Sequence, residues 1–241
     1  MHALTLTALA LLLVGTAGCG GDERPAHPGE DSQDYEDAPA GGDPTSPSDL
    51  VEGGEPGVPG STVPTRTWQT GGGRCYDYAG YVVRVRPRGN DVGESIAVFA
   101  VAEGAEARAR CDAPEAEAVV SVSGAEAEYF FGMERGLLFV DRGTAPNGRE
   151  LRVYDLNDDG AVVLDTEYEE PIQIEDGALT FGRPEDAYID PYIFESTGVE
   201  CPEATEWFEN GMGVGITRVV RLDLATRQVQ ETDERRCVPL Q

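Results

Sequence analysis

One pattern repeats from about residue 67 to the end of the chain: a short run rich in β-branched and aromatic residues, then a turn that contains Gly, Asn or Asp. Alternating or β-branched runs joined by such turns are typical of antiparallel hairpins. The runs lie at 81–85, 95–99, 118–122, 128–131, 137–140, 153–156, 161–164, 172–174, 178–181, 219–224 and 228–230. Two short segments, 103–109 and 202–210, have the pattern of helices. The sequence therefore predicts an all-β fold, a single domain of consecutive antiparallel hairpins arranged as a sandwich or a partly closed barrel, with one or two short helices.

A different composition precedes this domain. Residues 19–66 are dominated by Gly, Pro, Ser, Thr and acidic residues, and residues 20–66 hold eleven acidic residues and two arginines. Such a segment cannot bury enough apolar surface to repay the entropy of ordering it. A flexible chain of this length has a root-mean-square span of roughly 35 to 40 Å. We predict an acidic, Pro/Gly-rich disordered tether over 19–66 and a disulfide-stabilised all-β domain over 67–241.

The chain begins with an apolar run from Ala3 to Val14, which is followed by small residues and Cys19. A run of about a dozen residues is too short to cross a bilayer, since a spanning helix needs roughly 20. An apolar run of this length before small residues is typical of an export signal. Residues 1–18 are therefore predicted to form a signal peptide that is removed on export.

The residues around the predicted cleavage point, Val14-Gly15-Thr16-Ala17-Gly18-Cys19, resemble the lipobox of bacterial lipoprotein precursors. The resemblance covers this segment alone. It implies that Cys19 is lipidated, becomes the first residue of the mature protein and anchors it to a membrane. With Gly20 next to the cysteine, the resemblance implies an outer-membrane lipoprotein of the cell envelope, on its periplasmic or its surface side. The alternative is an ordinary signal peptide cut near Ala17 and Gly18.

Four cysteines remain after Cys19: Cys75, Cys111, Cys201 and Cys237. Four cysteines in an exported chain predict two disulfides, and the sequence allows three pairings. We favour Cys75–Cys111 with Cys201–Cys237, because each pair closes a short local loop. Each bridge would add roughly 3 to 4 kcal/mol in the loop-entropy account. Zinc is disfavoured, because no pair has the spacing of a zinc knuckle.

Two residue types that enzymes often use are scarce in this chain. Its histidines are His2 and His27, both before the predicted domain, and all eighteen basic residues are arginines. Histidine-based triads, Schiff-base lysines and phosphate-loop lysines are therefore excluded from the domain. The net charge of −27 argues against nucleic acid as a partner, because affinity for a polyanion comes mainly from Lys and Arg.

One segment matches the opening of a calcium loop. Asp155, Asn157 and Asp159 stand at alternate positions before Gly160, and oxygen side chains in this arrangement suit Ca²⁺. The twelfth position holds Thr166 rather than the glutamate that completes such a loop. The alternative to a calcium site is a hairpin turn, in which Asn, Asp and Gly supply positive φ angles.

Tyrosines beside aspartates form a second candidate site. Tyr76 and Tyr78 alternate along one predicted strand and so share one of its faces. Tyr188 and Tyr192 flank an Asp-Pro pair. Exposed rings beside carboxylates can stack on a glycan, whereas buried rings would belong to the core.

These observations together favour a non-catalytic binding or structural module, anchored by lipid and held off the membrane by the tether. The partner would be a protein or a glycan, which the sequence does not identify. No cofactor is implied apart from calcium in the alternative above. A calcium- or glycan-binding surface module is the second hypothesis, and a carboxylate-based glycoside hydrolase is the third. A binding module should expose an apolar or aromatic patch, whereas a hydrolase should present two converging acids in unlike environments.

Overall fold

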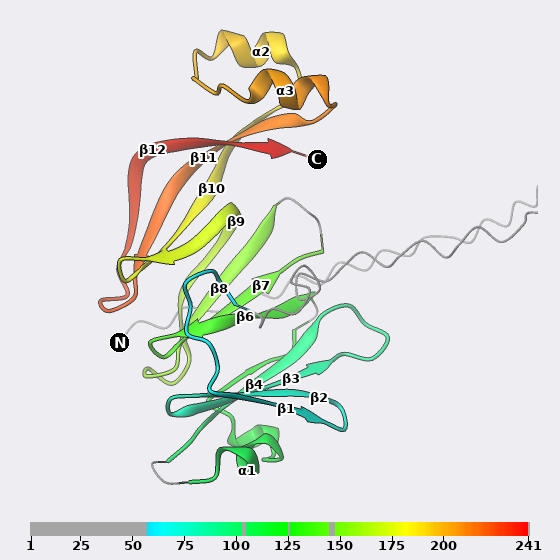
Figure 1. Cartoon of the computed structure of the whole chain (residues 1–241), viewed down its shortest axis with the longest axis vertical. Helices are drawn as coiled ribbons and strands as arrows, with labels where there is room; N and C mark the ends of the chain where they lie inside the picture. The colour runs from blue at the N-terminus through cyan, green and yellow to red at the C-terminus, as the bar shows by residue number, and fades with distance from the viewer. Residues whose placement is uncertain (1–56, 103–104, 125, 145–147, 241) are drawn as a thin grey trace, which may run out of the picture. The chain divides into compact units, whose positions relative to one another are not determined.

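The computed structural model describes residues 57–240, apart from 103–104, 125 and 145–147. The predicted signal peptide, Cys19 and most of the predicted tether lie outside the described residues. Two antiparallel sheets and a few short helices make up the described chain (Figure 1). The predicted all-β fold class is confirmed. No helix within the described residues combines the length and the apolar character needed to cross a bilayer.

The first sheet has five strands in sequence order. They are β1 (Arg66–Thr70), β2 (Gly73–Tyr78), β3 (Tyr81–Pro87), β4 (Glu94–Ala100) and β5 (Val120–Val122). Helix α1 (Ala107–Cys111) and a 3₁₀ turn (Glu115–Glu117) lie between β4 and β5. Each strand pairs with its neighbour in the chain, as consecutive hairpins require.

The second sheet has seven strands, also in sequence order. They are β6 (Glu128–Glu134), β7 (Leu137–Arg142), β8 (Arg149–Asp155), β9 (Ala161–Glu175), β10 (Ala178–Tyr188), β11 (Gly213–Asp223) and β12 (Val229–Leu240). Helices α2 (Pro191–Ser196) and α3 (Ala204–Glu209) interrupt the connection between β10 and β11.

The two sheets share one hydrophobic core. Alternation along β3 and β4 turns Val83, Val85 and Ile96 toward the second sheet. Leu138 and Val140 of β7 meet them from the other side. This contact gives the sandwich part of the fold its interior.

A second core lies on the opposite face of β7. Leu137 and Phe139, which alternate with the residues of the first core, pack with Leu179 and Phe181 of β10. β7 is therefore buried along its whole length. This double burial explains why the first four residues of β7, 137–140, are all apolar rather than alternating with polar ones.

The folded domain begins before residue 67, which corrects the predicted boundary between tether and domain. Val58 is buried in the second core. Its backbone N–H donates to the carbonyl of Phe131 at 2.9 Å, and the carbonyl of Pro59 accepts from Ile174 at 2.7 Å. Residues 58–59 thus connect β6 to the second half of β9. A single buried valine in a Pro/Gly-rich segment gives no periodic signal, so composition alone placed the boundary too late.

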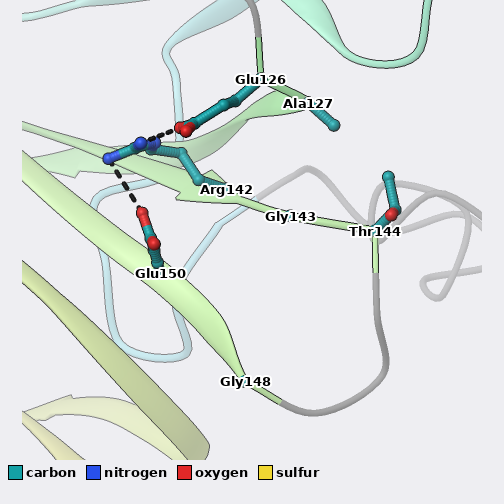
Figure 2. Close-up of a pocket in the computed structure, with 7 residues that line it drawn as sticks. All are labelled: Glu126, Ala127, Arg142, Gly143, Thr144, Gly148 and Glu150. Carbon is teal, nitrogen blue, oxygen red and sulfur yellow. Dashed lines mark hydrogen bonds and ion pairs between the residues drawn. The ribbon is translucent and has the colours of Figure 1, made fainter.

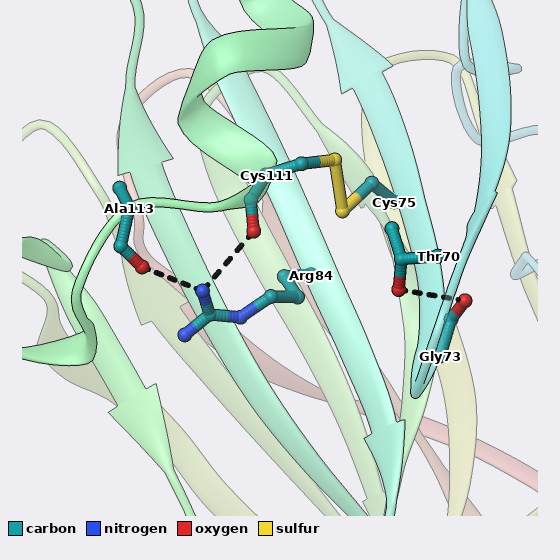
Figure 3. The surroundings of a disulfide bond; sticks show 6 residues. All are labelled: Thr70, Gly73, Cys75, Arg84, Cys111 and Ala113. Carbon is teal, nitrogen blue, oxygen red and sulfur yellow. Dashed lines mark hydrogen bonds between the residues drawn. A yellow bond between two sulfur atoms is a disulfide. The ribbon is translucent and has the colours of Figure 1, made fainter.

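The outer face of the first sheet is covered by α1 and the residues that follow it (Figure 3). A disulfide joins Cys75 of β2 to Cys111 of α1, the pairing favoured from the sequence. Buried Arg84 donates to the carbonyls of Cys111 at 3.1 Å and Ala113 at 2.6 Å. Its guanidinium also lies 4.8 Å from the centre of the Phe99 ring. The covalent bond and the buried arginine together hold the β4–β5 connection against the sheet.

Candidate functional site

The candidate site is the helical cap, which we define as residues 189–212 between β10 and β11 (Figure 1). The cap has a small core of its own, in which Phe194 and Ala204 pack on Val214 and Ile216 of β11. This cluster is separate from the two larger cores. The strands therefore serve as a platform for the cap.

The local sequence explains where the first cap helix forms. Asp190 precedes α2, and its Oδ1 accepts hydrogen bonds from the backbone N–H groups of Tyr192 at 2.8 Å and Ile193 at 3.4 Å. Pro191 occupies the first helical position, where its missing N–H costs nothing. Gly198 ends the segment at a φ of +70°, a left-handed conformation that glycine adopts without strain.

A cavity of about 520 Å³ opens between α2 and α3. Its volume falls within the range of small-ligand sites. The apolar lining comes from Pro191, Phe194, Val199, Cys201, Ala204 and Phe208, and the polar lining from Glu195, Thr205 and Glu209. The rings of Phe194 and Phe208 lie 6.0 Å apart, and Tyr188 meets Phe194 edge-on at 5.6 Å. The cavity thus has an aromatic floor and a partly acidic rim.

Apolar residues also cover the outside of α2. Ile189 is 89% exposed, Tyr192 81% and Ile193 57%. At helical spacing, Tyr192 and Ile193 lie on faces of α2 other than the one that carries Phe194 toward the cavity. Single exposed apolar residues are common on protein surfaces, whereas several close together in one segment are not. α2 therefore presents apolar surface that the described chain does not cover.

The helical cap is uniformly acidic. Its charged residues are Asp190, Glu195, Glu200, Glu203, Glu206 and Glu209, and it contains no arginine or lysine. The adjoining strands β11 and β12, by contrast, carry several arginines. The cap therefore carries negative charge alone, and Glu195 and Glu209 place part of it at the cavity.

The second pair of cysteines lies at the base of the cap, but the predicted Cys201–Cys237 disulfide is not formed in the structure. Cys201 lines the cavity, and the Cys237 thiol of β12 donates to the carbonyl of Glu200 at 3.8 Å. Burial and the neighbouring Cys201 raise the pKa of Cys237 to about 12. The sequence thus paired two cysteines that are neighbours in the fold, although both are free thiols here.

The tyrosine prediction divides into two outcomes. Tyr76 and Tyr78 share one face of β2 as expected, but that face is buried in the core between the sheets, and Tyr76 stacks near Phe130 at 5.0 Å. Neither ring can meet a ligand, which corrects that part of the prediction. Tyr188 is half-buried in the core of the cap, whereas Tyr192 stands exposed on α2.

The candidate calcium loop lies at the turn of the hairpin formed by β8 and β9, as its alternative reading from the sequence has it. The Asp155 carboxylate accepts from Arg227 at 2.7 Å and from the backbone N–H of Asn157 at 3.0 Å. The Arg227 guanidinium therefore supplies the positive charge that Ca²⁺ would bring, and it holds the pKa of Asp155 below its ordinary value. Tyr81 donates to the Asn157 side chain at 3.2 Å, and Asp159 adopts a φ of +49°. Among the residues that the structure describes, no cluster of three or more acidic, His or Cys side chains could hold a metal ion.

A second, polar cavity of about 300 Å³ lies beside Arg142 of β7 (Figure 2). Arg142 pairs with Glu126, with Glu150 at 3.0 Å and with Asp165 at 3.1 Å. One guanidinium is shared by three carboxylates, so its charge is already neutralised within the protein. This cavity offers no cation for an anionic ligand.

Two carboxylates with raised pKa values bear on the hydrolase hypothesis. Burial raises the pKa of Glu94, whose carboxylate accepts from the Phe130 backbone at 2.8 Å. Burial also raises the pKa of Asp141, which is bonded to Arg149 and to the Tyr168 hydroxyl. Both groups are engaged inside the protein rather than directed into a cleft. The geometry gives no support to a pair of glycosidase acids.

The main feature of the site was not predicted from the sequence, because no helix was expected at 191–196 and the cap was not distinguished from the sheet. The Asp190-Pro191 pair was the available signal, since it combines an N-cap residue with proline at the first helical position. Comparisons with protein-family models, with curated proteins and with solved structures find no match for this chain.

Proposed function

We propose that this protein is an exported, lipid-anchored binding module of the cell envelope, in which the helical cap binds a partner. Cys19 carries the lipid, and the acidic segment that follows holds the β domain away from the membrane. The observation that carries the proposal is the 520 Å³ cavity between α2 and α3, together with the exposed Tyr192 and Ile193. Exposed apolar side chains beside an apolar cavity are typical of interaction sites.

The chemistry of the domain supports binding rather than catalysis. The described chain contains neither histidine nor lysine. The cavity places carboxylates and a threonine beside aromatic rings, without a base and nucleophile in hydrogen-bonded contact. The Glu195 and Glu209 carboxylates and the Cys201 thiol of the lining are therefore not arranged as a nucleophile with its activating base.

The anchor can be tested by expressing the complete chain in a bacterium with two membranes and labelling it with radioactive palmitate. We expect label in the wild type, none in Cys19→Ser, and the wild type in the outer-membrane fraction. A mature chain that lacks both label and membrane association would instead show an ordinary signal peptide. Trypsin added to intact cells would then report the face of the membrane, because the domain is rich in arginine.

The cap can be tested with Nile red, a neutral dye whose fluorescence rises in apolar cavities. Thr205→Trp adds a ring at an exposed position on the cavity wall and should abolish the fluorescence. Gln230→Trp adds the same ring at an exposed position on β12 and serves as the control. Equal dye binding by wild type and both variants would refute the cap as the binding site.

A further inference from the structure

We infer that the helical cap binds a basic amphipathic segment of another protein. The apolar side chains of that segment would occupy the cavity and cover α2, and its lysines or arginines would meet the acidic rim. This inference rests on the proposed function, because it names the chemistry of the partner at the same site.

The negative charge of the cap favours a positively charged partner. Six carboxylates and no cation lie within 189–212, and Glu195 and Glu209 border the cavity directly. Apolar walls lower the local dielectric, so the field of these carboxylates at the cavity is stronger than in open water. A cation-bearing ligand is attracted to such a rim, and an anionic one is repelled.

The same charge excludes three other occupants. The segment 20–56 of this chain carries eleven acidic residues and one arginine, so it would be repelled by the cap. A second copy that met the first cap to cap would bring six further carboxylates against the first six. Anionic lipid headgroups have the sign of the cap itself.

The extent of the apolar surface favours a peptide over a small molecule. The cavity takes apolar groups on the inner side of α2, while Ile189, Tyr192 and Ile193 stand exposed outside it. A ligand confined to the cavity would leave these three residues in water. An amphipathic segment presents apolar side chains at several points along its length and can cover both surfaces.

The experiment uses the mature chain with Cys19→Ser and a fluorescently labelled peptide of fourteen leucines and lysines arranged at helical spacing. One comparison peptide replaces every lysine with glutamate, and another replaces every leucine with serine. Fluorescence anisotropy at physiological salt should show binding of the leucine–lysine peptide and at least about tenfold weaker binding of both comparison peptides.

Matched variants separate the rim from the overall negative charge of the protein. Glu195→Lys combined with Glu209→Lys should weaken binding by about tenfold or more. Glu167→Lys combined with Asp233→Lys changes the net charge equally at exposed positions on β9 and β12, and should leave binding within about twofold. Circular dichroism and the melting temperature establish that each variant is folded.

The outcomes distinguish this inference from the function on which it rests. Equal weakening by the two double variants, or equal binding of the acidic peptide, would overturn the inference. If Nile red binds in a Thr205-dependent manner but the basic peptide does not bind, the cap is a site for another ligand and the inference alone fails. If neither probe binds, the inference and the proposed function fail together.

Discussion

The buried ion pair between Asp141 and Arg149 allows a quantitative test of how the second sheet is stabilised. Asp141 of β7 is 1% exposed, and its carboxylate accepts from Arg149 Nε at 2.8 Å and from the Tyr168 hydroxyl at 3.0 Å. A second guanidinium nitrogen of Arg149 contacts the other carboxylate oxygen, so the pair is bidentate. Arg149→Met would leave a buried carboxylate without its cation.

We expect Arg149→Met to lower the free energy of unfolding by about 3 to 5 kcal/mol at pH 7, the usual cost of isolating one member of a buried pair. Burial already raises the pKa of Asp141 above its unfolded value in the wild type. Without Arg149, the folded pKa should rise further. A carboxyl with a raised folded pKa loses stability as pH rises from its unfolded pKa to its folded one. The destabilisation should therefore be small near pH 4 and large at pH 7.

Urea denaturation followed by tryptophan fluorescence at both pH values measures these differences. Arg152→Met is the matched control on the same strand, because its partner Asp165 is more exposed, and it should cost less than about 1 kcal/mol. The double variant Asp141→Asn with Arg149→Met should recover more than half of the loss, since it removes the buried charge. The reasoning is refuted if the two arginine variants cost the same, or if the cost of Arg149→Met does not depend on pH.

Protein recovered from an oxidising compartment should contain a Cys201–Cys237 disulfide, and intact mass after alkylation should show no free thiol there; two alkylated thiols would refute this. In the reduced protein, Cys237 should alkylate slowly, because its pKa of about 12 keeps it protonated. Asp155→Ala should cost about 1 to 3 kcal/mol at pH 7, because it removes the partner of Arg227. Since the folded protein lowers the pKa of Asp155, this loss of stability should disappear as the pH falls through that lowered pKa. Millimolar calcium should leave the wild-type melting temperature unchanged, and a calcium-dependent rise would restore the calcium hypothesis. Gly60→Ala should cost about 2 kcal/mol or more in thermal melts, because φ is +85° and the new Cβ would lie 2.2 Å from the Ile174 carbonyl oxygen; an unchanged melt would show that this segment is dispensable.

The strands and turns of the fold were predictable because a hairpin is formed by residues that are adjacent in the sequence. The Asp176-Gly177 turn between β9 and β10 is where the sequence placed it, and Asp176 adopts a φ of +50° there. The cores were less predictable, because they depend on contacts between distant strands. Alternation put Tyr76 and Tyr78 on one face, but nothing local showed that this face meets the other sheet.

The surroundings of the candidate calcium residues were unpredictable for a related reason. A run of oxygen side chains shows which residues could bind a cation, but not which cation reaches them. Arg227 lies 72 residues after Asp155 and comes beside it only through the β11–β12 turn. Its second contact, to the carbonyl of Arg135 at 3.0 Å, also joins the β6–β7 turn to this group. Three turns that are separate in the sequence therefore share one guanidinium.

The hairpin of β10 and β11 does not need the helical cap in order to form. Apart from a bulge at Glu185, β10 and β11 pair until Tyr188 lies opposite Val214, so a turn of a few residues would complete this hairpin. The chain instead inserts residues 189–212, with a small core apart from the two main ones. Connections that a rigid scaffold positions often carry binding residues. The exposed Tyr192 and Ile193 of this insertion lower its solubility, and the repulsion among its six carboxylates lowers its stability. A partner of opposite charge that covers the cap would offset both costs.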